Sequence, residues 1–335
     1  MVVSSSRWPD RVVLQDRPTP LEPLDRLSRH LGRGDGELFV KRDDLTQVAG
    51  GGGKVRKLEF VAARAVLEGA DTLVTLGAVQ SNAARTTATV ARRLGLHACL
   101  ILVGEPPATD TGNVLLDRLF GAEIRWCAAD DPRSEREVLA DEADRLRRIG
   151  YRPHVIPSGV SSAIGALGYV RAANELLDQL PDTDVVVTAS GTGATQAGLV
   201  VGIGDHSRVL GVRIGNRPQL RERVATLGEE CAQLLGKDPP VGTPRLDEDH
   251  VGGGYRDPTM SGFEAISLLA RLEGLVLDPV YTGKAMAAML THLREQRIHP
   301  GARVVFLHSG GVPGLFAADE SEWVAERLGS VDRHH

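Results

Sequence analysis

Residues 72–96 read TLVTLGAVQSNAARTTATVARRLGL, and this stretch decides the fold class. Its first six residues form an apolar run of strand length, whereas residues 81–96 are amphipathic and long enough for a helix. A buried strand that leads directly into a helix is typical of an α/β protein with parallel sheets. The stretch therefore predicts one strand–turn–helix step of such a fold.

The same alternation continues along most of the chain. Further strands are expected at 98–103, 122–127, 184–190, 208–214 and 303–308, and further helices at 112–121, 133–149, 162–180, from 195, and at 217–236, 261–273 and 282–295. Two such sets of strands and helices indicate two α/β domains. We expect residues 1–57 and 163–335 to form the larger domain and residues 58–162 the smaller one.

The composition narrows the classes of function. The chain has 335 residues, a formal net charge of -5 and a pI near 6.1, so we expect neither a nucleic-acid partner nor an anionic membrane surface. No apolar segment has the length of a signal-peptide core or a membrane span, which predicts a cytoplasmic protein. Three cysteines without CxxC spacing predict buried thiols instead of disulfides or a zinc site.

The stretch GGGGK at residues 50–54 supplies the first candidate for chemistry. It is not a nucleotide P-loop, because Val48 stands where the first glycine should be and Val55 has no hydroxyl for magnesium. Any lysine chemistry must come from five positions, which are Lys41, Lys54, Lys57, Lys237 and Lys284.

A second glycine-rich stretch, SGTGATQAG at residues 190–198, follows an apolar strand and opens a helix. It is not a dinucleotide fingerprint, because Gln196 stands at the position of the third glycine. Free amides at a helix N-terminus, together with two threonine hydroxyls, form a nest that suits a phosphate. A generic strand-to-helix turn is the alternative.

The turn GAVQSNAAR at residues 77–85 places Gln80, Ser81 and Asn82 at the start of a helix. Ser81 and Asn82 could simply cap the helix. The same free amides could also hold a substrate carboxylate, with the Ser81 hydroxyl facing a reacting carbon. The spacing does not separate these two interpretations.

Three further features complete the candidates. Tyr255 and Tyr281 lie in glycine-rich turns, where a polar tyrosine is more often a site residue than a core residue, and Tyr281 is expected between a short strand and a helix. Ser309 stands at a strand end in FLHSGGVPG, residues 306–314. The acidic run DEDH at residues 247–250 could bind a metal, but adjacent acids in a loop are usually solvated, so no metal is expected.

Five of these stretches together resemble, in order and spacing, the D-cysteine desulfhydrase and 1-aminocyclopropane-1-carboxylate (ACC) deaminase family of pyridoxal-phosphate enzymes. They are GGGKVRKLEF, GAVQSN, SGTGATQAG, LDPVYTGKAM and HSGGVP, and the resemblance covers about residues 17–318. It implies the tryptophan synthase β-like fold (fold type II), with pyridoxal 5'-phosphate in the interdomain cleft. It also implies a small amino-acid substrate and a homodimer.

The resemblance assigns roles in cofactor binding. Lys54 would bind the cofactor covalently, and this needs an amine that is neutral near pH 7. Asn82 would bond the phenolic oxygen of the cofactor ring, and Ser309 would face the ring nitrogen. The cofactor phosphate would be held by Thr192, Gly193, Ala194 and Thr195.

The resemblance also assigns roles in substrate binding. Ser81 would lie beside the substrate α-carbon and carboxylate, with Gln80 and Asn82 next to it. Tyr255 and Tyr281 would line the active site. Lys54 would take the α-proton, and loss of a β-substituent would lead to an oxo acid and ammonia.

One position discriminates between the two reactions of the family. ACC deaminases have a glutamate directly after the tyrosine of DPVY, where it can keep the ring nitrogen protonated, but this chain has Thr282. The Ser309 hydroxyl is a neutral partner, which suits expulsion of a good leaving group. We therefore expect β-elimination, with ACC deamination as the alternative. A non-catalytic cofactor-binding protein is the alternative from another class.

The sequence departs from the family pattern in three places. Gly53 replaces the asparagine before the lysine, Ala83 stands where the desulfhydrases usually have histidine, and Arg256 and Met260 alter the pattern around Tyr255. Arg256 could pair with an anionic β-substituent such as a sulfonate, which would make the protein a cysteate-type lyase. Cofactor binding is thus the firmer prediction and substrate identity the weaker one.

Overall fold

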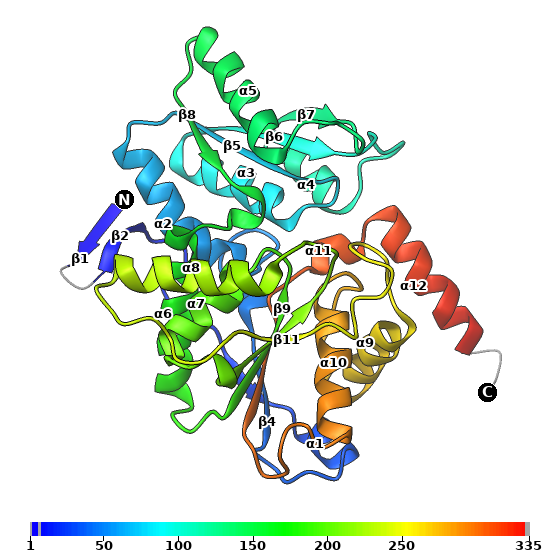
Figure 1. Cartoon of the computed structure of the whole chain (residues 1–335). Coiled ribbons are helices and arrows are strands. Elements are labelled where there is room, and N and C mark those ends of the chain that lie inside the picture. Colours follow the sequence, from blue (N-terminus) through cyan, green and yellow to red (C-terminus); the bar gives the residue numbers. More distant parts are fainter. Residues whose placement is uncertain (1, 6–7, 332–335) are drawn as a thin grey trace. The chain divides into compact units, whose positions relative to one another are not determined.

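The computed structural model describes residues 2–5 and 8–331, which fall into two compact units (Figure 1). Unit 1 comprises Met1–Gln47, Gly51–Ala63 and Ser161–Gly311, and unit 2 comprises Val48–Gly50, Arg64–Val160 and Val312–His335. The expected larger domain included everything from residue 163 onward. In the structure the segment from Val312 belongs to unit 2 instead, because the helix at Val312–Leu315 packs on the helix at Gly112–Leu119.

Unit 1 is built on a six-stranded sheet with the order β11-β10-β9-β12-β4-β3 within the described residues. The strands are β3 (Leu21–Pro23), β4 (Leu38–Lys41), β9 (Val185–Ser190), β10 (Val209–Arg213), β11 (Arg245–Asp247) and β12 (Val304–Leu307). Neighbouring strands run parallel except β3, which pairs antiparallel with β4. A separate antiparallel pair is formed by β1 (Val2–Ser5) and β2 (Trp8–Val12).

Helices pack against this sheet and bury its apolar strands. The helices of unit 1 are α1 (Asp25–His30), α2 (Lys54–Leu67), α6 (Ala163–Gln179), α7 (Ala194–Ile203), α8 (Leu220–Leu234), α9 (Met260–Glu273) and α10 (Thr282–Arg294), with short 3₁₀ turns η1 (Asp43–Leu45) and η3 (His206–Arg208), and α8 packs on α6 and α7. One core cluster joins α9 and α10 to the sheet, and another joins α6 and α7 to it. The two clusters show that both faces of the sheet are covered, as its continuous apolar strands require.

Unit 2 has a parallel four-stranded sheet with the order β7-β6-β5-β8 among its described residues. The strands are β5 (Thr72–Ala78), β6 (His97–Val103), β7 (Glu123–Cys127) and β8 (Pro153–Ile156), and the helices are α3 (Asn82–Leu94), α4 (Gly112–Leu119), α5 (Glu135–Arg148), α11 (Val312–Leu315) and α12 (Ala318–Val331), with the 3₁₀ turn η2 (Ser158–Val160). The stretch that opened the sequence analysis thus forms β5 and α3, and α3 ends at Gly95 in the left-handed conformation.

One expected strand is absent from the described residues, and the expectation for the cysteines is confirmed. No strand precedes Tyr281, because residues 275–280 form an irregular segment that ends in a turn. The three cysteines are buried and unbridged, as expected. No helix among the described residues is long and apolar enough to cross a membrane.

Candidate active site

Lys54 is the first residue of α2 and directly follows the glycines. The chain reaches it through Gly51 and Gly52, both with positive φ, and a Cβ on Gly51 would lie only 1.8 Å from the carbonyl oxygen of Asp44. Gly53 donates its N–H to the carbonyl oxygen of Ser309 at 2.9 Å. The glycines therefore allow close backbone approach between this loop and its neighbours, which a side chain would prevent.

Gly53 lacks a side chain for a specific reason. A Cβ at this position would lie 1.6 Å from the hydroxyl oxygen of Tyr169, which is fully buried on α6. Tyr169 also fits against Gly198 on α7, where a Cβ would come within 2.6 Å of the Tyr169 Cβ. The tyrosine hydroxyl therefore takes the space in which the family's asparagine would begin.

The amines of Lys54 and Lys57 are hydrogen bonded to one another, one turn apart on α2. Desolvation lowers the pKa of Lys54 to about 8. Burial lowers the pKa of Lys57 well below its usual value, and the charge of Lys54 lowers it further. Two adjacent ammonium groups repel each other, so the pair favours a neutral amine close to neutral pH.

The other lysines are placed differently. Lys284 donates to the carbonyl oxygens of Val251 and Gly254 at 2.7 and 2.8 Å, and Lys237 is exposed. Lys41 is buried and donates to Glu175 at 2.5 Å and to Gln179 at 2.6 Å. These three lysines lie outside the Lys54–Lys57 pair, and Lys54 stays the predicted residue for amine chemistry.

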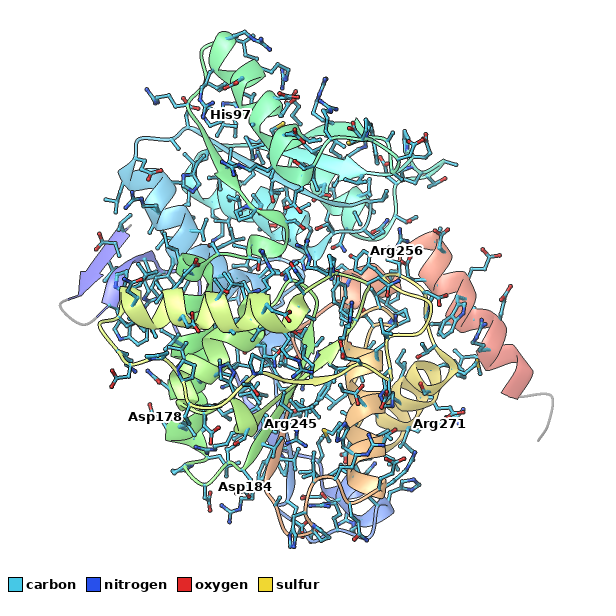
Figure 2. The ribbon with its side chains drawn as sticks, viewed as in Figure 1. His97, Asp178, Asp184, Arg245, Arg256 and Arg271 are labelled. Atoms are coloured by element: carbon cyan, nitrogen blue, oxygen red, sulfur yellow. The ribbon has the colours of Figure 1, made fainter. Side chains whose placement is uncertain are left out.

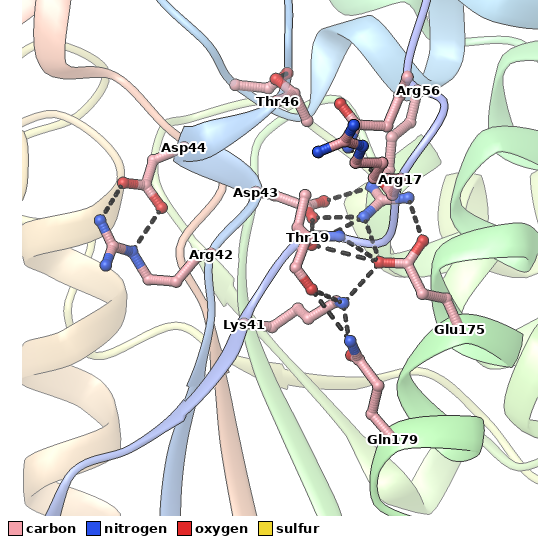
Figure 3. A network of polar contacts seen from close by, with 12 residues as sticks. Arg17, Thr19, Lys41, Arg42, Asp43, Asp44, Thr46, Arg56, Glu175 and Gln179 are labelled. Carbon is pink, nitrogen blue, oxygen red and sulfur yellow. Dashed lines mark hydrogen bonds and ion pairs between the residues drawn. The ribbon is translucent and has the colours of Figure 1, made fainter. Parts of the chain in front are cut away.

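A buried ionic network fixes the first turn of α2 (Figure 3). Arg56 binds the Asp43 carboxylate with two nitrogens at 2.8 and 2.7 Å, and it binds Glu175 at 2.9 Å. Figure 3 shows Thr19 and Lys41 joined to the same group, with Thr19 donating to Asp43 at 2.9 Å. Because both acids are paired with cations, the network holds α2 in place without an uncompensated buried charge.

The predicted phosphate nest forms the start of α7. Gly193 is the N-cap in the left-handed conformation, with φ +91°, and no side chain caps the helix. The first N–H groups of α7, from Ala194 onward, therefore have no intrahelical acceptor. The carbonyl of Thr192 is turned away from them, since it accepts bonds from Ser161 at 2.7 Å and Arg223 at 3.0 Å. Free amides and a positive helix end suit a phosphate.

Tyr255 and Tyr281 form a pair. Their hydroxyl oxygens are 2.5 Å apart, and their rings meet edge to face with centroids 5.9 Å apart. Desolvation raises the pKa of Tyr281 well above its usual value, and the neighbouring Tyr255 phenol adds to this. A phenol that stays protonated beside a second hydroxyl can donate a proton to a leaving group.

Arg256 follows Tyr255 on the loop between β11 and α9, where Figure 2 labels it. Its φ of +59° is rare for a residue other than glycine. Its positive charge acts on Tyr281 and lowers the pKa of that phenol, against the larger effect of desolvation.

Thr282, the residue that separates the two reactions of the family, is buried and already bonded. Its hydroxyl donates to Asp278 at 2.6 Å, and Asp278 also accepts the backbone N–H groups of Val280, Tyr281 and Thr282. This cap replaces the strand expected before Tyr281. Ser309, directly after β12 and His308, is partly exposed.

Unit 2 contributes the turn between β5 and α3. Ser81 is the N-cap of α3 and accepts the N–H of Ala84 at 3.2 Å, so the capping interpretation is correct. A serine hydroxyl that accepts this bond still has its own hydrogen to donate. Gly77 makes room for it, since a Cβ there would lie 2.4 Å from the Ser81 hydroxyl. Capping and substrate binding are therefore compatible.

Gln80 links this turn to the start of α4. Its amide nitrogen donates to the carbonyl oxygen of Thr111 at 3.1 Å, and its amide oxygen accepts the N–H of Asn113 at 2.7 Å. Asn82 is partly exposed, and its amide oxygen accepts from the Asn113 side chain at 3.0 Å. Both predicted residues are thus held in defined orientations.

Residues 12–310 match the family described as "Pyridoxal-phosphate dependent enzyme". The chain belongs to this family. It is 44% identical to D-cysteine desulfhydrase of Yersinia pestis (strain Pestoides F), over 92% of this chain and 95% of that protein. It is 45% identical to D-cysteine desulfhydrase of Klebsiella pneumoniae, over 93% and 97%.

Solved structures give the same result for the fold. The chain superposes on a crystal structure of an ACC deaminase homologue with a TM-score of 0.86 and 36% identity, over 96% of this chain and 97% of that one. A pyridoxal 5'-phosphate-dependent aspartate racemase, at 18% identity and a TM-score of 0.63, shares the fold alone. The resemblance inferred from the five stretches, the fold type and the cofactor are therefore confirmed.

The residues of unit 1 fit pyridoxal 5'-phosphate. The aldehyde of the cofactor reacts with a neutral amine. The Lys54–Lys57 pair favours such an amine, because the pKa values of both lysines are lowered. The cofactor also has a phosphate, which suits the free N–H groups of α7. The Tyr169 hydroxyl is buried beside Asp43 and Thr195, and Thr195 belongs to the stretch predicted to hold the phosphate.

Two departures from the family now have a structural setting. Gly53 is matched to Tyr169 within the protein interior. Ala83 is buried on α3, with 3% of its surface exposed, next to the Ser81 turn. The acidic run at residues 247–250 has a structural role, because Asp247 accepts bonds from His250 and His292 at 2.8 Å each.

Sequence reasoning missed the residues that support the site. They are Ser161, Tyr169 and Arg223 in unit 1 and Arg85, Asn113 and Asp117 in unit 2. Each contacts a segment about 30 or more residues away or fills a buried position, so no local pattern marks it. The one available signal was the GN pair at residues 112–113, a glycine with φ +57° before an asparagine at a helix start.

Proposed function

We propose that this protein is a pyridoxal-phosphate dependent lyase that eliminates the β-substituent of a small amino acid, with D-cysteine as the substrate. The proposal is supported by the D-cysteine desulfhydrases that the chain resembles along most of its length. The single structural observation that carries it is the Lys54 amine, which has a lowered pKa at the start of α2. The overall reaction converts D-cysteine and water to pyruvate, ammonia and hydrogen sulfide.

When bound, the cofactor supplies an electron sink for the carbanion at the α-carbon. Lys54 would hold the cofactor through its amine and would take the α-proton as a general base. Both tasks need the neutral form of Lys54, and desolvation makes that form easier to reach by lowering the pKa to about 8. The amine of Lys57, one turn along the helix, lies 5.8 Å from the centre of the Tyr169 ring, and burial together with the Lys54 charge disfavours its protonation.

The other residues bind and orient. The N–H groups from Thr192 to Thr195 hold the phosphate, and Ser309 faces the ring nitrogen with a neutral hydroxyl. Asn82 donates to the phenolic oxygen. These roles follow from family membership and from the free donors at each place.

Ser81 and the two tyrosines act on the substrate. The Ser81 hydroxyl, with its hydrogen free to donate, binds the substrate carboxylate, and Gln80 keeps the turn in shape. Tyr281 stays protonated through its raised pKa, so the Tyr255–Tyr281 pair can donate a hydrogen bond to the departing sulfur.

ACC deamination is the second candidate, favoured by the TM-score of 0.86 to an ACC deaminase homologue. Against it stands Thr282, whose hydroxyl is occupied by Asp278 and which carries no acid for the ring nitrogen. Opening the cyclopropane ring of ACC needs strong electron withdrawal by the cofactor. A neutral Ser309 hydroxyl beside the cofactor nitrogen favours this withdrawal less than an acid would. The elimination reaction makes no such demand.

The test is a panel of D- and L-cysteine, D- and L-cysteate and ACC, with oxo acid, ammonia and sulfide measured for each. We expect sulfide and oxo acid in equal amounts from D-cysteine, and none from the Lys54→Ala variant. A visible absorption band at about 410–420 nm, absent from that variant, would accompany the activity. Turnover of ACC alone would assign the second candidate, and a colourless protein would refute both.

We also propose a cytoplasmic homodimer, as the family resemblance implies. Light scattering on the purified protein tests the dimer. A mass near 36 kDa, one chain, would refute it.

A further inference from the structure

Asn113 is a fully buried residue near the start of α4, and it bonds to three parts of unit 2. Its side-chain nitrogen donates to the carbonyl oxygen of Gln80 at 3.0 Å and to the side-chain oxygen of Asn82 at 3.0 Å. Its side-chain oxygen accepts from Arg85 at 3.1 Å. Both hydrogens of the amide and one of its acceptor sites are therefore used.

The orientation of the two asparagine amides follows from chemistry alone. A guanidinium only donates, so the Asn113 atom that faces Arg85 must be its oxygen. The nitrogen of Asn113 then faces the Gln80 carbonyl, which only accepts, and this second contact agrees with the first. The Asn82 atom that faces the same nitrogen must be an oxygen. The amide nitrogen of Asn82 consequently points to the opposite side.

Arg85 is itself fixed. It is buried with 1% of its surface exposed, and it donates to the carbonyl oxygen of Ala49 at 2.5 Å as well as to Asn113. Its neighbour Asp117 is fully buried on α4, where the Arg85 charge lowers the pKa of that carboxyl against the larger, raising effect of burial. The guanidinium cannot turn away without losing these contacts, so the orientation of Asn113 is set from outside the turn.

We propose that Asn113 is a positioning residue that holds the Asn82 amide with its N–H groups toward the phenolic oxygen of the cofactor. The inference rests on the proposed function, because it takes Asn82 as the donor to that oxygen. Without Asn113 the Asn82 amide could turn by 180°, and its oxygen would then face the phenolic oxygen and repel it. Asn113 thus decides which end of Asn82 meets the cofactor.

The test uses Asn113→Asp, which keeps the size of the side chain and the bond from Arg85. A carboxylate cannot donate to Asn82 or to the Gln80 carbonyl, so the Asn82 amide is expected to reverse. The cofactor affinity of the apoenzyme is measured by fluorescence titration with pyridoxal 5'-phosphate and with its 3-deoxy analogue, which lacks the phenolic oxygen. We expect about tenfold weaker binding of pyridoxal 5'-phosphate, the loss of one hydrogen bond to a charged group, and an unchanged affinity for the analogue.

Asn82→Asp is the second variant, because it presents an oxygen to the cofactor whatever Asn113 does. It should show the same selective loss, and the double variant should bind no more weakly than either single one. If Asn113→Asp weakened both ligands equally, the residue would act on folding of the turn and the inference would be wrong. Equal binding of pyridoxal 5'-phosphate by wild type and variant would refute it as well.

The outcome also separates this inference from the proposed function. A wild-type protein that binds the cofactor through Lys54, together with an indifferent Asn113→Asp variant, refutes the inference alone. A wild-type protein without cofactor binding refutes both. Unfolding of the apoenzyme variants by urea shows whether a loss of affinity reflects a loss of fold. If Asn113→Asp does not fold, Asn113→Ala, which also removes the donor to Asn82, decides the question by the same selective loss of affinity.

Discussion

The starts of α2 and α3 perform related tasks by opposite means. At α2, glycines remove side chains so that backbone and a buried tyrosine hydroxyl come close to Lys54. At α3, polar side chains are added until nearly every donor and acceptor of the turn is bonded. The start of α2 thus depends on the absence of side chains, and the start of α3 depends on side-chain hydrogen bonds. Substitutions should therefore fail at α2 by adding atoms and at α3 by removing bonds.

The largest expected effect separates the chemical roles of the two helix starts. Lys54→Ala should lower kcat by at least about 10⁴-fold and abolish the visible band, because the amine is the nucleophile and the base. Ser81→Ala should keep the band and lower kcat/KM by about 10²-fold, since the serine contacts only the substrate. Steady-state assays and absorption spectra measure both. A Ser81→Ala protein without the band would contradict this division.

At α2 the next test adds one atom. Gly53→Ala should destabilise the protein by about 1–3 kcal/mol, because its Cβ would lie 1.6 Å from the Tyr169 hydroxyl. The φ of Gly53 is not positive, so the backbone conformation is no obstacle. Urea unfolding gives the free energy. Tyr169→Phe removes the clashing oxygen and should reduce the cost of Gly53→Ala.

The matched control is Gly329→Ala, because a Cβ there meets nothing within 4 Å. This variant should be as stable as wild type or slightly more stable, since alanine is the better helix former. An equal loss in both variants would show that the space at Gly53 does not matter.

At α3 the matching test changes one buried charge. Burial raises the pKa of Asp117 to about 8, against the pull of Arg85. The folded state then keeps a proton that the unfolded chain loses near pH 4, so this residue costs stability increasingly as the pH rises from about 4 to 8. Asp117→Asn removes that cost. The advantage of the variant over wild type should grow by about 1 kcal/mol for each pH unit between pH 5 and pH 8.

Urea unfolding at several pH values measures this difference. Asp130→Asn serves as the control, because Asp130 is an exposed acid in the same unit. It should track wild type across the range. A constant difference between Asp117→Asn and wild type from pH 5 to pH 8 would show that Asp117 is ionised throughout.

The smallest expected effect lies outside both helix starts, on the loop of Arg256. As a hypothesis, its charge beside the tyrosine pair favours an anionic leaving group such as sulfonate. Arg256→Ala should then lower the preference for cysteate over cysteine by about tenfold, the loss of one charge-assisted hydrogen bond. Arg256→Lys should lose less. An Arg256→Ala variant with unchanged selectivity between cysteate and cysteine would refute the hypothesis.

Much of the fold could be read from the sequence, because long apolar strands and amphipathic helices have distinct periods. The expected strands at 72–77, 98–103 and 184–190 agree with β5, β6 and β9 within one or two residues. The short strands β4 and β11 were missed, since a few residues carry too little period to recognise. The strand expected before Tyr281 was wrong, because Asp278 caps the chain into a turn there.

The residues of the candidate site were predicted less evenly. Lys54 could be singled out because glycines precede it and only four other lysines exist. The dual role of Ser81 could not be decided, because capping and substrate binding need the same residue type at the same place. Tyr169 and Asn113 were invisible, since their importance lies in contacts with Gly53 and Asn82 that only the folded chain creates.

The close approach of two loops in unit 1 limits how this protein can diverge. Gly53 donates to the Ser309 carbonyl, and a Cβ on Gly310 would lie 2.6 Å from the Cα of Gly52. A side chain added at Gly52 or Gly310 would therefore need a compensating change in the backbone of the other loop. New substrates are more accessible through the loop of Arg256 and Met260, which can vary without this double condition. Among related enzymes, the loops of Gly53 and Ser309 should therefore stay the same, while the loop of Arg256 should vary with substrate specificity.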